Sequence, residues 1–118
     1  MTDLDKLQEM VIKFRDERDW KQFHNPKDTT ISLVLEATEL LEHFQWKNEE
    51  EIAKHLKNNK TDVAEELADV LYWVLLIAND LDIDLSQSFY DKMLKNVSKY
   101  PVKKAKGNHL KYTVLEDK

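Results

Sequence analysis

Residues 66–71 read Glu-Leu-Ala-Asp-Val-Leu, a stretch in which two acids stand three positions apart inside an apolar run. On a helix such a pair shares one face, with Cβ atoms about 5–6 Å apart, and the like charges repel. Apolar residues occupy most of the circle around Asp69, which predicts a helix that is buried on nearly all sides. An ionised carboxylate on such a helix needs a partner, and few basic residues stand nearby. The stretch therefore predicts a helical core that holds a cation.

A second acidic pair, Glu36 and Glu39, repeats the same spacing earlier in the chain. Four carboxylates from two facing helices, with no His or Cys among them, suit Mg²⁺, with Mn²⁺ as a substitute. We predict that the metal ligands are Glu36, Glu39, Glu66 and Asp69. The alternative is a solvated acidic face, because such pairs are common in a chain with 35% charged residues.

The composition limits the classes of protein to which the chain can belong. It has 118 residues, 42% of them apolar, with one Gly and two Pro, which favours helices and a single domain over residues 1–118. The absence of Cys excludes disulfides and thiolate sites. A net charge of −5 argues against binding to nucleic acid. No stretch reaches the ~18 apolar residues of a membrane span and no signal peptide is visible, so we expect a cytoplasmic protein.

Hydrophobic periodicity predicts an all-α fold, a bundle of four or five helices. The expected helices run from about 3 to 19, 28 to 44, 49 to 56, 61 to 81 and 85 to 99. A polar turn at 58–60 separates the third from the fourth helix, and Pro101 ends the fifth. The remainder, about 102–118, is read as an irregular tail.

Aromatic and basic residues accompany the acids. Trp20 and His24 stand in a loop that ends at Pro26, where they either line a pocket or plug the end of the bundle. Trp73 lies one helical turn from Asp69 and is either core or a platform for a ligand. Lys92, Lys95, Asn96 and Lys99 form a row that is either solvated or a phosphate clamp. Oxygen ligands, flat side chains and cations together suit a nucleoside triphosphate. The chain has no P-loop motif.

The sequence resembles the MazG-like all-α nucleotide pyrophosphohydrolases, and within them the dCTP pyrophosphatase branch. The family signature is E-x-x-E, a spacer and E-x-x-D, which the four acids match. The motifs shared with the branch are Glu17-Arg18-Asp19-Trp20, Phe23-His24, Pro26, Phe44-Gln45-Trp46, Asp69-Val70-Leu71, Lys92-Met93, Asn96, Tyr100-Pro101 and Lys111-Tyr112-Thr113.

This resemblance implies Mg²⁺-dependent hydrolysis between the α- and β-phosphates, which gives a monophosphate and pyrophosphate in a house-cleaning role. It implies a homodimer or homotetramer that completes the bundle. Either Glu36 or Glu39 is expected to activate water. The residues implied in substrate binding are Trp20, Trp46 and Trp73 with His24 for the base, and Lys92, Asn96, Lys111 and Tyr112 for phosphates or sugar. Relatives commonly carry Tyr at the position of Trp73, so the preferred base can differ here.

Three other readings remain open. A carboxylate-bridged di-iron or di-manganese bundle needs Glu-x-x-His motifs, which neither acidic pair provides. A non-enzymatic helical interaction module would use the acids as a charged face. Within the enzymes, the alternative is a dUTP-directed or broad-specificity nucleoside triphosphate pyrophosphatase.

Overall fold

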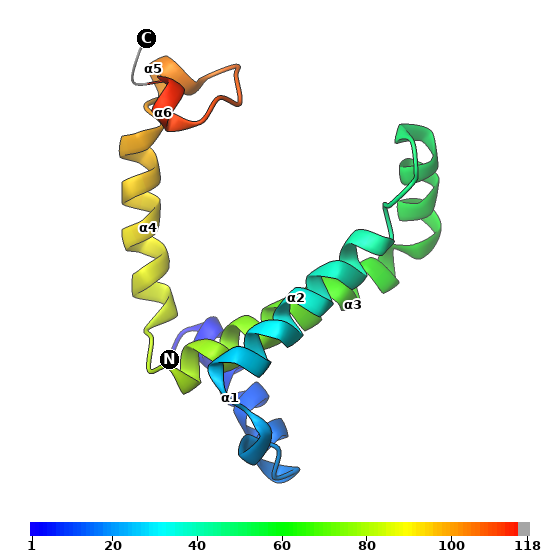
Figure 1. Cartoon of the computed structure of the whole chain (residues 1–118), viewed down its shortest axis with the longest axis vertical. Coiled ribbons are helices and arrows are strands. Elements are labelled where there is room, and N and C mark those ends of the chain that lie inside the picture. The colour runs from blue at the N-terminus through cyan, green and yellow to red at the C-terminus, as the bar shows by residue number, and fades with distance from the viewer. Residues whose placement is uncertain (116–118) are drawn as a thin grey trace. The chain divides into compact units, whose positions relative to one another are not determined.

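A computed structural model describes residues 1–115, and all its regular elements are helices. They are α1 (Asp3–Glu17), the short 3₁₀ helix η1 (Lys21–Phe23), α2 (Pro26–Glu42), α3 (Glu49–Asp80), α4 (Leu85–Lys99), α5 (Val102–Ala105) and α6 (Tyr112–Leu115) (Figure 1). The predicted all-α class is confirmed. No helix within residues 1–115 combines the length and apolarity needed to cross a membrane.

The chain divides into two compact units, Met1–Ile83 and Asp84–Lys118. The first contains both acidic pairs and is described first. In the second, the side chain of Asp84 accepts a hydrogen bond from the Gln87 amide at 3.1 Å and so caps α4. That residues 1–118 act as one domain stays a prediction.

Side-chain caps decide where the helices of the first unit begin. Asn25 Oδ1 accepts a hydrogen bond from the Asp28 backbone amide at 2.9 Å, and Pro26 occupies the first turn. Asn is a preferred N-cap and Pro tolerates the first helical position, because the N–H that it lacks would have no partner there. Helix α2 therefore begins at Pro26, two residues earlier than predicted, with Asp28 inside its first turn.

The predicted turn at 58–60 is a kink within one helix. Asn59, with φ −129° and ψ 25°, is non-helical, yet α3 continues through it from Glu49 to Asp80. The Asn59 side-chain amide donates to the His55 carbonyl oxygen, one helical turn earlier, at 3.2 Å. Such side-chain hydrogen bonds to the backbone compete with helical geometry and are found where helices bend. Two helical segments therefore meet at the predicted turn, with a kink at Asn59 in place of a loop.

The core of the first unit lies where α3 packs against α1 and α2. Leu75 and Leu76 of α3 are 2% and 0% exposed, and Val11 of α1 and Val63 of α3 are also buried. The helix predicted over 61–81 was expected to be buried on nearly all sides. This was wrong for the single chain, because Leu67 is 53% exposed. Two neighbouring helices cover only part of its circumference.

The tail is more regular than predicted, since it forms α5 and α6. Tyr112 of α6 packs edge-on against Tyr100, with ring centroids 6.2 Å apart, and Lys99 Nζ lies 4.6 Å from the centre of the Tyr112 ring. Leu115 is buried. The last part of the predicted tail, 116–118, lies outside the described residues.

Candidate active site

Three of the four predicted metal ligands meet between two helices. One carboxylate oxygen from each of Glu36 and Glu39 on α2 and Glu66 on α3 lies within 4.8 Å of the others. Helices α2 and α3 run side by side along this part of the chain (Figure 1). The i, i+3 spacing places the two acids of α2 on one face, and the packing brings Glu66 to them.

The oxygen atoms of this cluster lack the partners that buried carboxylates need. Among the described residues, Oε2 of Glu36 and Oε2 of Glu66 are buried without a hydrogen-bond donor. Leaving such atoms unpaired is costly, and three negative groups at this separation repel one another. A hard divalent cation would satisfy both requirements with oxygen ligands alone. The cluster therefore fits a divalent metal ion.

Asp69 adds negative charge near the cluster from a position one turn further along α3. Its side chain is exposed and stands outside the three-residue cluster, but it borders a cavity together with Glu36. Burial raises the pKa of Glu36, and the neighbouring Glu39 carboxyl and the charge of Asp69 raise it further. Burial and then Glu39 also raise the pKa of Glu66. Protons and a cation therefore compete for the same oxygens.

An aromatic cavity of about 440 Å³ opens beside the acids. Tyr72 and Trp73 stand edge to face with centroids 5.1 Å apart, and Phe14 stands likewise against Trp20 at 5.6 Å. The lining residues are Met10, Val11, Phe14, Trp20, Glu36, Asp69, Tyr72 and Trp73. The structure thus brings Trp20 and Trp73 to one cavity with two of the acids. Sequence reasoning did not identify Tyr72 or the residues of α1 as part of this cavity, because apolar residues at helical spacing are typical of any core.

A polar cavity of about 470 Å³ borders the other two acids. It is lined by Glu39, Glu42, His43, Lys47, His55 and Glu66. His43 follows Glu39 by one helical turn, which is the only sign of this cavity in the sequence. The approach of His55 could not be predicted, because it depends on how α3 folds back along α2.

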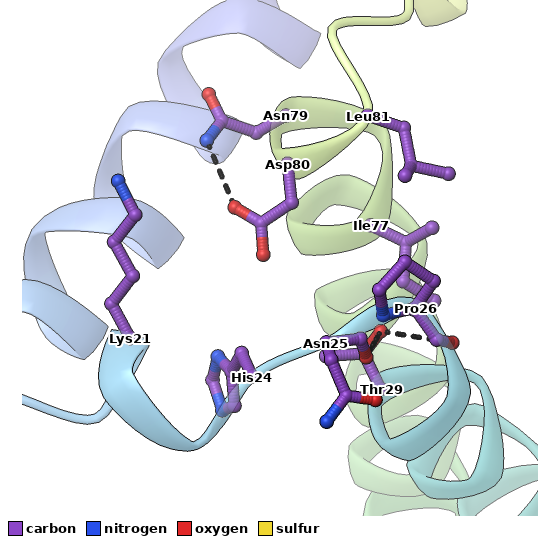
Figure 2. A pocket seen from close by; sticks show the side chains of 9 residues that line it. All are labelled: Lys21, His24, Asn25, Pro26, Thr29, Ile77, Asn79, Asp80 and Leu81. Carbon is purple, nitrogen blue, oxygen red and sulfur yellow. Dashed lines mark hydrogen bonds between the residues drawn. The ribbon is translucent and has the colours of Figure 1, made fainter.

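His24 lines a third cavity, of about 310 Å³, between the η1 loop and the C-terminal end of α3 (Figure 2). Its ring stands edge to face with Trp73 at 5.6 Å between centroids, and its Nδ1 is buried without a partner in the part of the chain described. Burial, followed by the charge of Arg15, lowers the pKa of His24. The imidazole is therefore neutral at pH 7 and can both donate and accept a hydrogen bond.

Trp46 lines none of these three cavities, and the other predicted binding residues, Lys92, Asn96, Lys111 and Tyr112, belong to the second unit. Trp46 is 91% exposed and has a left-handed backbone, with φ 68°. Lys92 and Asn96 belong to α4, where Asn96 Nδ2 contacts Met93 Sδ at 3.8 Å. Lys111 is exposed, and Tyr112 is half-buried in α6. The roles of these five residues in substrate binding stay predictions.

A helical fold that presents a carboxylate cluster from two packed helices beside an aromatic cavity defines a class of metal-assisted helical enzymes. The model of the MazG-like family matches residues 31–115, and the chain belongs to the MazG-like family. The predicted resemblance is thereby confirmed.

Particular relatives agree with this assignment. The chain is 39% identical to dCTP pyrophosphatase 1 of Mus musculus over 114 residues, which are 95% of this chain and 67% of that protein. It is 35% identical to dCTP pyrophosphatase 1 of Homo sapiens over the same share of each chain. A crystal structure of a pyrophosphatase from Archaeoglobus fulgidus superposes with a TM-score of 0.79 at 36% identity, covering 86% of this chain and 94% of that one.

Proposed function

We propose that this chain is a Mg²⁺-dependent nucleoside triphosphate pyrophosphohydrolase that cleaves dCTP, or a modified dCTP, to the monophosphate and pyrophosphate. The observation that carries the proposal is the cluster of Glu36, Glu39 and Glu66 at the edge of an aromatic cavity that contains Trp20 and Trp73. The relatives named as dCTP pyrophosphatases support the substrate. The cytoplasmic location stays a prediction from the sequence.

The four acids and the aromatic residues have separate tasks in this proposal. Glu36, Glu39, Glu66 and Asp69 would hold the ion, which when bound neutralises phosphate charge and lowers the pKa of a bound water. Glu36 or Glu39 would orient that water and accept its proton, because both carboxylates belong to the cluster that would hold the ion. Trp20 and Trp73 would stack on the base, and His24 behind Trp73 would support the position of that ring.

We also propose that the protein is a homodimer or homotetramer. Val34 and Leu35 of α2 are each 58% exposed, and Leu67 of α3 is 53% exposed, so the acid-bearing helices carry an apolar surface. Exposed apolar side chains on adjacent helices are typical of an interface. A second copy would also give the 91% exposed Trp46 a surface to pack against. Light scattering of the purified protein should give a multiple of 14.0 kDa, and a monomer would contradict this proposal.

The proposed substrate is tested by measuring pyrophosphate release from dCTP, 5-modified dCTP, dUTP and the other nucleoside triphosphates. We expect Mg²⁺-dependent release that is greatest with dCTP and its derivatives. In Trp73→Ala, loss of base stacking of about 1–3 kcal/mol should raise KM for the preferred nucleotide roughly 5- to 160-fold, with a smaller change in kcat.

Trp73→Tyr is the matched control, because it keeps an aromatic ring and should retain KM within a few-fold of the wild type. Equal release from all bases would keep the hydrolase and contradict the dCTP preference. Absence of release from every nucleotide would favour the non-enzymatic interaction module.

A further inference from the structure

The carboxylate cluster joins two cavities of opposite character. Glu36 borders the aromatic cavity, whose lining contains no Lys, Arg or His. Glu39 and Glu66 border the polar cavity, whose lining includes Lys47, His43 and His55. A nucleoside triphosphate has the same division, with a flat base at one end and three charged phosphates at the other. The two cavities therefore indicate the direction in which the substrate lies across the acids.

A chain of hydrogen bonds determines which nitrogen of His43 carries a proton. Asn59 Nδ2 donates to the His55 carbonyl oxygen at 3.2 Å and lies 3.3 Å from His55 Nδ1. A carbonyl oxygen can only accept a hydrogen bond, so the side-chain atom of Asn59 that faces it is the amide nitrogen Nδ2. The same Nδ2 faces His55 Nδ1, which must therefore accept its second N–H. Burial and Lys47 lower the pKa of His55, so this ring is neutral at pH 7 and its single proton is on Nε2.

The proton on His55 Nε2 then decides the state of His43. His55 Nε2 lies 2.8 Å from His43 Nδ1, so His43 Nδ1 accepts the hydrogen bond and the N–H of the His43 ring is at Nε2. Both rings are half-buried, and His55 and Asn59 stand four residues apart in α3, about one helical turn. His43 therefore has one N–H that this chain of hydrogen bonds leaves free to donate.

We propose that His43 and Lys47 bind the β- and γ-phosphates of the substrate, and so hold the pyrophosphate product, in the polar cavity. This inference rests on the proposed function. His55 and Asn59 are positioning residues that keep His43 as an Nε2–H donor. Phosphate oxygens require N–H donors and a cation, and of the two cavities at the acids only this one supplies both. Glu42 also borders it and opposes an anion, which makes the charge of Lys47 necessary.

The experiment compares inhibition by the two products, with dCTP as substrate and free Mg²⁺ held constant. Formation of dCMP is followed by chromatography with added pyrophosphate, and pyrophosphate release is followed with added dCMP. A lost hydrogen bond to a charged group, about 1.5–3 kcal/mol, corresponds to a change of roughly 10- to 160-fold. In His43→Leu and in Lys47→Met, the Ki for pyrophosphate should rise at least about 10-fold, while the Ki for dCMP stays within about 2-fold.

Matched variants separate binding from general damage. Lys54→Met removes an exposed lysine of α3 and should leave both constants unchanged. Trp73→Ala should weaken inhibition by dCMP and leave inhibition by pyrophosphate unchanged. His55→Leu should raise the Ki for pyrophosphate in the same direction as His43→Leu, and His55→Gln should restore part of it, since its amide can still donate to His43 Nδ1.

Two failures are distinguishable. A wild-type protein that hydrolyses no nucleotide would overturn the proposed function and this inference with it. Normal hydrolysis in which both His43→Leu and Lys47→Met keep the wild-type Ki for pyrophosphate would overturn this inference alone.

Discussion

Glu66→Gln is expected to lower Mg²⁺-dependent pyrophosphate release by at least about 100-fold, since changes even beyond the direct ligands of a metal cost about 10- to 100-fold. Glu66 is the only member of the three-carboxylate cluster that comes from α3, so its loss leaves α3 with Asp69 alone, which stands outside the cluster. Initial rates with dCTP measure the effect. The control is Glu65→Gln, which makes the same charge change at the neighbouring exposed position and should keep wild-type rates.

Glu66→Gln should also lose the rise in Tm that Mg²⁺ gives the wild-type protein. Burial and like charges raise the folded-state pKa of Glu36 and Glu66, so the metal-free folded state binds more protons than the unfolded state. The free energy of unfolding of the metal-free protein should therefore fall as pH rises from the ordinary Glu pKa through the raised values. Because Mg²⁺ binds the ionised acids, it should raise Tm more at pH 7.5 than at pH 5. If Mg²⁺ left the Tm of the wild-type protein unchanged at both pH values, the result would contradict the metal site.

Asp80→Asn is expected to destabilise the protein by about 2–3 kcal/mol. Arg15 is 1% exposed, and its Nη1 lies 2.7 Å from both Asp80 oxygens. Removing the negative partner leaves a buried charge with only Asp16, 3.2 Å from Nε, for compensation. Breaking a buried pair costs about 3–5 kcal/mol, and we lower this figure because Asp80 is 24% exposed. Urea denaturation measures the change.

Two controls test the origin of this loss. Arg15→Met combined with Asp80→Asn should recover part of the stability, because no charge then remains buried. Glu17→Gln breaks a 3.8 Å pair with Lys13 whose side chains are 57% and 78% exposed, and it should change stability by less than about 0.5 kcal/mol. Equal stability of the wild type and Asp80→Asn would contradict a structural role for the pair.

The acidic pairs, and Trp20 and Trp73 beside them, were the part of the candidate site that could be predicted from the sequence. Glu36 and Glu39 stand three residues apart on one helix, so their proximity is a local property that spacing reveals. Glu66 joins them only because α2 and α3 pack together, which the repeat of the motif suggested. Trp46 shows the limit of this reasoning, because its resemblance to a base-binding residue does not place it at a cavity within one chain.

The sequence by itself determined the all-helical class, membership of the MazG-like family and the two acidic pairs, because helical periodicity and i, i+3 spacing are short-range properties. Only the tertiary structure decided the contacts that cross the chain. Arg15 meets Asp80 65 residues further on, and His43 meets His55 because of how the chain folds back between α2 and α3. It also decided that Leu67 stays exposed. These features depend on which surfaces pack together, and periodicity along one helix carries no information about the neighbour that it meets.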